Sequence, residues 1–177
     1  MSTTETTLTG RVVRPGDSDY AAASAGWNLL YSHRPAVVVF AQETRDVVNA
    51  LAWARHNGLP VRARSGRHSL EGWNAVDDGV VIDVSELKSA TIDADARTAT
   101  VGAGLNQMEA VTALGAAGFA APTGTEGTVG LVGATLGGGF GGGRHPDSRR
   151  RCRGSRGRRT EQRRSALGVA RCRQRQL

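Results

Sequence analysis

The stretch AVVVFAQETRDVVNALAWARHNGLPVRARSGRHS, residues 36–69, decides the fold. It opens with a β-branched apolar run, residues 36–40, which is typical of a buried strand. Apolar residues then recur at helical spacing, with Thr44 as the predicted N-cap and Asn57-Gly58 as the end of the helix. Residues 61–64 predict a second strand. The stretch is therefore a β-α-β unit that runs directly into a glycine-containing loop.

The segments on either side indicate a mixed α+β fold. Before the unit, helical spacing predicts an amphipathic helix over residues 17–31. After it, residues 80–84 and 98–101 predict further strands, with a turn at residues 93–96 before the second of them. Apolar spacing over residues 105–115 predicts another helix.

Two loops are candidates for ligand binding. Residues 65–69 follow the end of a predicted strand, where ligands collect in α/β architectures. Their backbone N–H groups can converge on an anion such as a pyrophosphate, and the neighbouring arginines would compensate its charge. In residues 124–141, glycine recurs too densely for a stable helix or strand, which favours a backbone that approaches a ligand closely.

Both loops resemble parts of a known flavoprotein family. Residues 64–73 (RSGRHSLEGW) resemble the "RSGGHSxxG" loop of the berberine-bridge-enzyme-like branch of the vanillyl-alcohol-oxidase superfamily. Arg67 stands where a second glycine is commoner, a variant shared with 6-hydroxy-D-nicotine-oxidase-like members. Residues 124–134 and 136–141 are similar to the family's second flavin loop and its "GGGxG" continuation. The resemblance covers residues 30–141.

The resemblance implies the N-terminal part of a PCMH-type FAD-binding domain. His68 matches the flavin-linked histidine, whose neutral imidazole nitrogen adds to a methyl group of the flavin's benzenoid ring after that methyl loses a proton. Doubly linked members carry cysteine where Glu126 stands, and residues 1–141 contain no cysteine, so a single covalent link is expected. The expected cofactor-binding residues are Arg64, Ser65, Gly66, Arg67, His68, Ser69, Gly127, Thr128, Val129, Gly130, Gly133 and Gly138.

The activity implied by the resemblance is that of a flavin-dependent oxidase. FAD in that family takes a hydride from a C–H bond of a small-molecule alcohol, amine or sugar, and O2 reoxidises it. The catalytic base and substrate pocket would lie beyond Gly141, so no catalytic residue is identified and the truncated chain is expected to be inactive alone. Asp83 is expected to cap the turn that follows it, and Trp27, Trp53 and Trp73 are expected to be packing residues.

The C-terminal 36 residues differ in composition from the rest. Residues 142–177 carry 13 arginines against 2 acidic residues, whereas residues 1–141 carry 10 lysines and arginines against 14 acids. The tail lacks apolar periodicity and is predicted to be disordered. GC-rich DNA read out of frame gives such a composition. A back-translation of residues 165–176 chosen among synonymous codons, read one nucleotide later, encodes LLWALRGAGNG, which resembles a segment of FAD-linked oxidases.

The predicted organisation therefore has three parts. Residues 1–30 form an N-terminal extension and helix, residues 31–141 a partial FAD-binding domain, and residues 142–177 a disordered, frameshifted tail. An unfinished sheet leaves apolar faces and strand edges uncovered, so an open reading frame without a stable product is an alternative.

The arginine-rich tail leaves a second class of function open. The chain has a formal net charge of +7 and could bind nucleic acid by neutralising phosphates. The acidic balance of residues 1–141 argues against this, and any such binding would be non-specific and confined to the tail. The polar N-terminus and the absence of an apolar run of about 20 residues predict a cytoplasmic protein without a membrane partner. No metal site is predicted.

Overall fold

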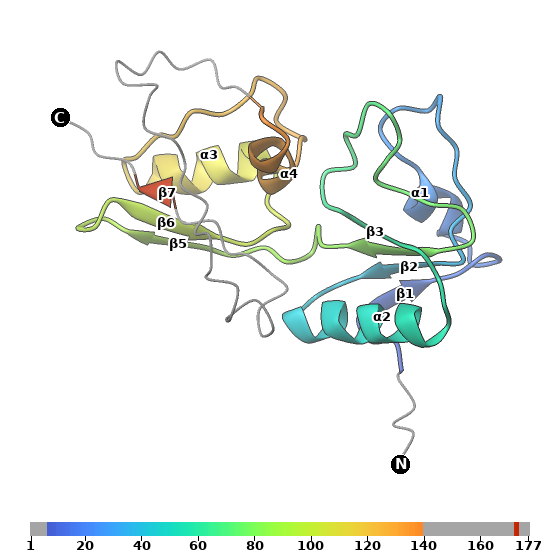
Figure 1. The fold of residues 1–177 in the computed structure, drawn as a ribbon. Helices are drawn as coiled ribbons and strands as arrows, with labels where there is room; N and C mark the ends of the chain where they lie inside the picture. The colour runs from blue at the N-terminus through green and yellow to red at the C-terminus, as the bar shows by residue number, and fades with distance from the viewer. Residues whose placement is uncertain (1–6, 140–171, 174–177) are drawn as a thin grey trace. The chain divides into compact units, whose positions relative to one another are not determined.

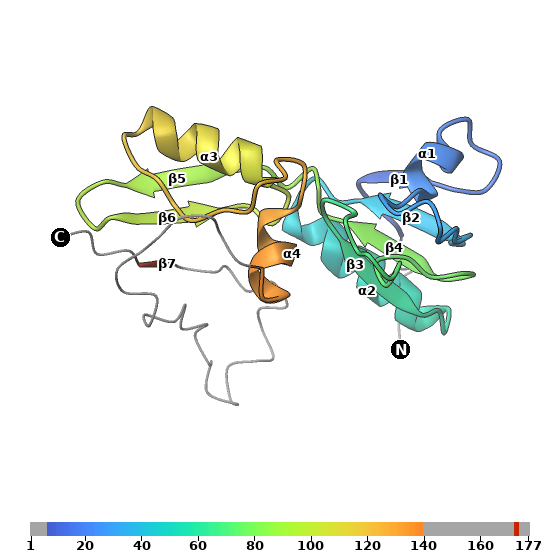
Figure 2. The same ribbon diagram turned by 90° about the horizontal axis from the view of Figure 1, so that it is seen from above.

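The computed structural model describes residues 7–139 and 172–173, and the chain divides into two compact units after Leu87. The first unit, with the elements labelled in Figure 1, contains a four-stranded sheet in the order β1-β2-β4-β3, which Figure 2 shows. Strands β2, β4 and β3 are parallel, and β1 is antiparallel to β2. The elements are β1 (Arg11–Val13), α1 (Tyr20–Ser24), β2 (Val37–Phe40), α2 (Thr44–His56), β3 (Val61–Arg64) and β4 (Val80–Asp83). The predicted β-α-β unit is thus confirmed, with β4 inserted between its two strands.

Both faces of this sheet are covered. Val38 pairs with Val81 and packs in a buried cluster with Val13, Ala23 and Ala75, on the face that carries α1. Side chains alternate along a strand, so the neighbouring apolar residues of β2 and β4 point to the opposite face. Helix α2 runs alongside the strands and buries its own apolar side chains (Figures 1 and 2). Burial on both sides explains the continuous apolar runs of β2 and β4.

Helix α2 begins at Thr44 with Glu43 as its N-cap, one residue earlier than predicted. The Asp46 carboxylate accepts hydrogen bonds from the Gln42 and Glu43 N–H groups at 2.9 and 3.1 Å, and from the Thr9 hydroxyl at 2.6 Å. Burial by itself would raise the pKa of Asp46, but these hydrogen bonds outweigh it and hold the pKa below its usual value. Asp46 therefore fastens the start of α2 to the chain before β1.

The helix predicted over residues 17–31 is much shorter in the structure. Helix α1 ends at Ser24, and the Asn28 side chain accepts a hydrogen bond from the Leu30 N–H at 3.1 Å, which stabilises a turn. Trp27 and Leu30 are 58% and 89% exposed instead of lining a helix face. The prediction failed because a local side-chain hydrogen bond competes with the helix.

The second unit is built on an antiparallel sheet in the order β5-β6-β7. Its elements are β5 (Ala90–Asp93), β6 (Thr98–Val101), α3 (Gln107–Ala116), α4 (Leu131–Leu136) and β7 (Cys172–Arg173). The predicted turn, strand and helix are confirmed at residues 93–96, β6 and α3. The prediction that residues 124–141 are too rich in glycine for a helix is wrong at α4, whose six residues include one glycine.

Two further elements had no sequence prediction, the short strands β1 and β5. Two residues of the predicted disordered tail, 172–173, pair with β6 as strand β7. The remaining predictions for residues 142–177 lie outside the described residues.

We expect Asp46→Asn to lower the free energy of unfolding at pH 7 by about 1–3 kcal/mol, because the ionised carboxylate holds three hydrogen bonds. A depressed pKa gives stability that is present above the ordinary pKa of aspartate, about 3.9, and is lost as pH falls through the folded-state value. Urea unfolding should therefore show the difference shrinking below pH 4. The control Glu71→Gln alters an exposed acid of the same unit, and an equal effect there would contradict the assignment.

Candidate functional site

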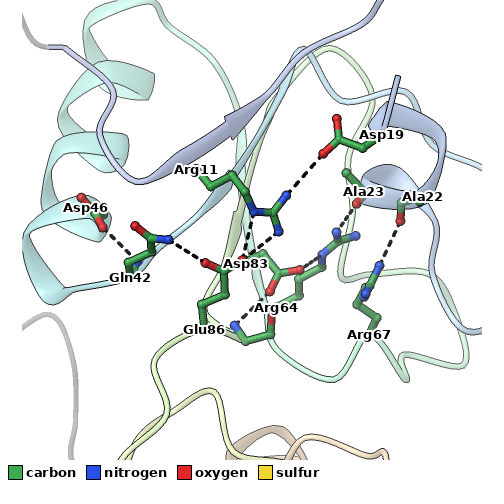
Figure 3. Close-up of polar contacts among 11 residues, drawn as sticks. Arg11, Asp19, Ala22, Ala23, Gln42, Asp46, Arg64, Arg67, Asp83 and Glu86 are labelled. Carbon is green, nitrogen blue, oxygen red and sulfur yellow. Dashed lines mark hydrogen bonds and ion pairs between the residues drawn. The ribbon is translucent and has the colours of Figure 1, made fainter. Parts of the chain in front are cut away.

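A buried ion pair joins the C-terminal ends of β3 and β4. Arg64 and Asp83 are register partners on these strands, and Arg64 Nε donates to Asp83 Oδ2 at 2.8 Å (Figure 3). Their side chains are 1% and 0% exposed. Burial lowers the pKa of Arg64, and the negative charge of Asp83 opposes that shift. The second Asp83 oxygen accepts the Ser85 N–H at 2.9 Å, which confirms the predicted cap.

The rest of the Arg64 guanidinium is bound to the end of α1. One Nη atom donates to the main-chain oxygen of Ala23 (Figure 3). The other donates to the main-chain oxygen of Ser24 at 3.5 Å. We expected the Arg64 charge to compensate an anionic ligand. The structure corrects this role, because a guanidinium enclosed by Asp83 and these carbonyls has no surface to offer a ligand. Arg64 instead fixes the base of the loop that follows it.

Residues 65–69 form the first predicted ligand loop. Ser65 Oγ is buried and has no hydrogen-bond partner among the described residues. Gly66 is half-buried, and Arg67 follows it with φ +63°, in the left-handed region where glycine is least strained. Arg67 Nη1 donates to the Ala22 carbonyl at 3.0 Å (Figure 3). Ser69 Oγ accepts the Trp73 N–H at 3.0 Å.

His68 lies half-buried in the middle of this loop, and its imidazole stacks on the Trp27 indole. The ring centroids are 5.1 Å apart and the planes differ by 25°. Sequence reasoning missed Trp27 in this role and predicted a packing residue. Trp27 and Trp73 are 58% and 73% exposed, so neither is packed in the core of the unit. The nearest sequence signal was Asn28, a residue type that favours turns.

Residues 127–130 lie in the second unit, against the start of α3. The first two N–H groups of that helix, from Gln107 and Met108, donate at 3.0 Å to the carbonyls of Val129 and Gly127. A helix start normally leaves such donors without partners, so they hold this loop in place. Gly130 faces Asn106 across an isolated bridge.

The other predicted residues of the second loop have distinct positions. The Thr128 N–H and hydroxyl both donate to the Glu126 carboxylate, at 3.1 and 2.7 Å. Gly133 lies within α4, and Gly138 follows that helix with φ +83°. The structure therefore brings residues 64–69 together in the first unit and the glycine-loop residues together in the second.

A second buried polar atom lacks a partner beside this loop. Gln107 is 5% exposed, and its Oε1 has no hydrogen-bond partner within the described part of the chain. A Cβ placed on Gly124 would lie 3.0 Å from the Gln107 amide, so the glycine allows the two segments to meet. Each predicted loop thus lies beside an unsatisfied buried polar atom.

Comparisons with known families, sequences and structures all match this chain to FAD-linked proteins. The family model described as "FAD binding domain" matches residues 35–156. The chain is 46% and 44% identical, each over 137 residues, to the FAD-linked oxidoreductases YvdP and YgaK of Bacillus subtilis, covering 77% of this chain and 31% and 30% of theirs. The structure of 6-hydroxy-D-nicotine oxidase from Arthrobacter nicotinovorans superposes with a TM-score of 0.74 at 31% identity, covering 80% of this chain and 31% of that chain.

The chain spans about a third of the length of these relatives. None of the helices within residues 7–139 is both long and apolar enough to cross a bilayer. The matches give no support to nucleic acid as a partner.

Removing one member of the buried pair should be costly. Arg64→Met leaves the Asp83 carboxylate buried without a counter-ion and should lower the free energy of unfolding by about 3–5 kcal/mol. The double variant Arg64→Met/Asp83→Leu should lose less free energy of unfolding than the sum of the losses in Arg64→Met and Asp83→Leu. The reason is that it leaves no unpaired charge buried. Arg62→Met, an exposed arginine of the same strand, is the control. Additive effects in urea unfolding would contradict the coupling.

Proposed function

Because the chain belongs to the FAD binding domain family, we propose that it supplies part of the FAD site of a flavin-dependent oxidase. When bound, FAD would accept a hydride from a C–H bond of a small organic substrate and pass the electrons to O2. Three buried side-chain polar atoms lack a hydrogen-bond partner among the described residues, namely Ser65 Oγ, Asn74 Nδ2 and Gln107 Oε1. The observation that carries the proposal is that two of them, Ser65 Oγ and Gln107 Oε1, lie beside the two glycine-containing loops.

These residues fit such a cofactor chemically. An unpaired buried polar atom costs about 1–3 kcal/mol, so a ligand that bonds to it recovers that energy. The Ser65 hydroxyl is able to donate to a phosphate oxygen, and Gln107 Oε1 is able to accept from a hydroxyl or a ring N–H. Gly66 and Gly124 have no side chain to block approach to the backbone.

Apart from Arg64, which is enclosed by protein groups, the residues predicted from the sequence remain the proposed cofactor contacts. Arg64 contributes indirectly, by holding the base of the loop. Arg67 uses one guanidinium nitrogen on the Ala22 carbonyl and has further N–H donors for an anionic group. The full proposed set of contacts is Ser65, Gly66, Arg67, His68, Ser69, Gly127, Thr128, Val129, Gly130, Gly133 and Gly138.

We propose His68 as a single covalent attachment point for the flavin. The resemblance of residues 64–73 supports this role, as does the fixed position of the imidazole against Trp27. A second link through sulfur has no donor in residues 1–141, which contain no cysteine.

We further propose that the 177-residue chain alone holds FAD weakly and turns over no substrate. A cofactor of this size is buried between converging elements, and the relatives are about three times as long as the matched region. Either loop alone would leave much of such a ligand in water, where electrostatic contacts are weak.

Titration of the isotope-labelled chain with FAD should give weak, saturable NMR shifts at the amides of residues 64–72 and 124–138. Ser65→Ala should weaken the response at least about threefold, because it removes a hydrogen bond worth about 1 kcal/mol. Ser24→Ala, which alters a hydroxyl in an exposed helix end, should leave it unchanged. Shifts that avoid both loops would contradict the FAD site, and tight stoichiometric binding would contradict the proposed weak affinity.

We also propose that the reading frame is shifted after Gly141. Restoring the frame should then yield a yellow protein whose flavin stays attached after denaturation. His68→Ala should abolish this attachment, because it removes the nucleophilic nitrogen. His56→Ala, at the end of α2, is the matched control and should keep the covalent flavin. Denaturation followed by gel fluorescence measures the attached fraction, and covalent flavin in His68→Ala would refute the assignment.

A further inference from the structure

Trp27 and Asn28 contact the loop that carries His68 at three successive positions along it. The Trp27 N–H donates to the Arg67 carbonyl at 3.0 Å. The Trp27 ring stacks on the His68 ring with a centroid distance of 5.1 Å. Asn28 Nδ2 then donates to the Leu70 carbonyl at 2.7 Å. A segment about 40 residues earlier in the sequence thereby follows the loop on both sides of the histidine.

The holding segment is itself constrained. Asn28 Oδ1 accepts the Leu30 N–H at 3.1 Å, and the Tyr31 N–H donates to the Asn28 carbonyl at 3.2 Å. At the far end of the loop, Gly72 has φ +72°, and a Cβ there would lie 2.7 Å from the Tyr31 side chain. Residues 27–31 therefore lie against the loop from Arg67 to Gly72 along its whole length.

Burial does not account for this arrangement. Trp27 is 58% exposed, and the ring contact of its side chain is with one face of the His68 imidazole. Trp73 is in the same loop and is 73% exposed, and no ring contact is found for it within the described residues. Trp27 is thus distinguished by its position over His68.

We propose that Trp27 and Asn28 are positioning residues, which set the plane of the His68 imidazole and the shape of its loop before any cofactor is bound. This inference rests on the proposed attachment of flavin to His68. Stacking on the Trp27 indole covers one face of the imidazole and so fixes the plane of the ring. A fixed nucleophile reacts faster than one that must first be ordered.

The proposed covalent attachment of the flavin to His68 is an oxidation overall. A C–N bond forms between an imidazole nitrogen of His68 and the flavin's ring-methyl carbon. The methyl C–H and the imidazole N–H are lost as protons. The released electron pair would pass through the bound flavin to O2, which would take up the two protons and leave as H2O2. Trp27 and Asn28 take no part in these bond changes.

The first test uses the chain without flavin. NMR of the imidazole protons, with His68→Ala to identify them, should show His68 shifted upfield by the Trp27 ring current. Trp27→Leu should move these resonances downfield, Trp27→Phe should restore most of the upfield shift, and Trp73→Leu should leave it unchanged. His68 chemical shifts that stay the same in Trp27→Leu would overturn the proposal.

The second test isolates Asn28. Asn28→Asp keeps the oxygen that accepts the Leu30 N–H and removes the donor to Leu70. Amide exchange at Trp27 and Trp73 should accelerate about tenfold, as expected for loss of one supporting hydrogen bond. Exchange at Val84, which donates to the Arg64 carbonyl at 2.8 Å, should stay constant. Unchanged exchange at Trp27 and Trp73 would count against the role of Asn28.

The third test measures attachment in the frame-restored protein. Trp27→Leu should slow covalent flavin incorporation at least about tenfold while non-covalent FAD is retained, and Trp27→Phe should recover the rate. Equal rates would overturn the positioning role even if His68 carries the flavin. Absence of covalent flavin from the unsubstituted protein would contradict the proposed function instead, and the two tests without flavin would still decide the geometry.

Discussion

The buried pair between Arg64 and Asp83 is the constraint on which the first unit depends. An ion pair enclosed this completely incurs a large desolvation cost, which is recovered only when every donor and acceptor finds a partner. Both Asp83 oxygens have partners, in Arg64 and the Ser85 N–H, and each of the three guanidinium nitrogens of Arg64 donates to Asp83 or to a carbonyl at the end of α1. The pair therefore fixes two strand ends and one helix end together.

Arginine suits this position because its guanidinium carries donors in several fixed directions. One direction meets the neighbouring strand, and another meets the main chain at Ala23 and Ser24. That main chain continues within a few residues to Trp27 and Asn28, which hold the His68 loop. The loop leaves β3 directly after Arg64, so one side chain anchors both the loop and the segment that shapes it.

Local patterns in the sequence predicted the elements whose signals are themselves local. The apolar run of β2, the spacing of α2 and the turn before β6 are read from neighbouring residues. Strands β1 and β5 acquire their structure from pairing with β2 and β6, which spacing does not reveal. The loop around His68 was found through its resemblance to a family. The partner of Arg64 depends on the register of β3 against β4, and Trp27 depends on the turn at Asn28, so neither followed from the sequence alone.

Arg67 shows how the loop balances strain against contacts. A non-glycine residue with φ +63° carries a conformational cost of about 1–2 kcal/mol, which a glycine would avoid. The arginine in return donates to the Ala22 carbonyl, and its own carbonyl accepts the Trp27 N–H. The side chain and the main chain of Arg67 thus bind the same segment from two directions. A glycine at position 67 would keep the main-chain hydrogen bond with Trp27 but lose the side-chain hydrogen bond to the Ala22 carbonyl. The strained arginine therefore adds a second hydrogen bond between the loop and residues 22–28.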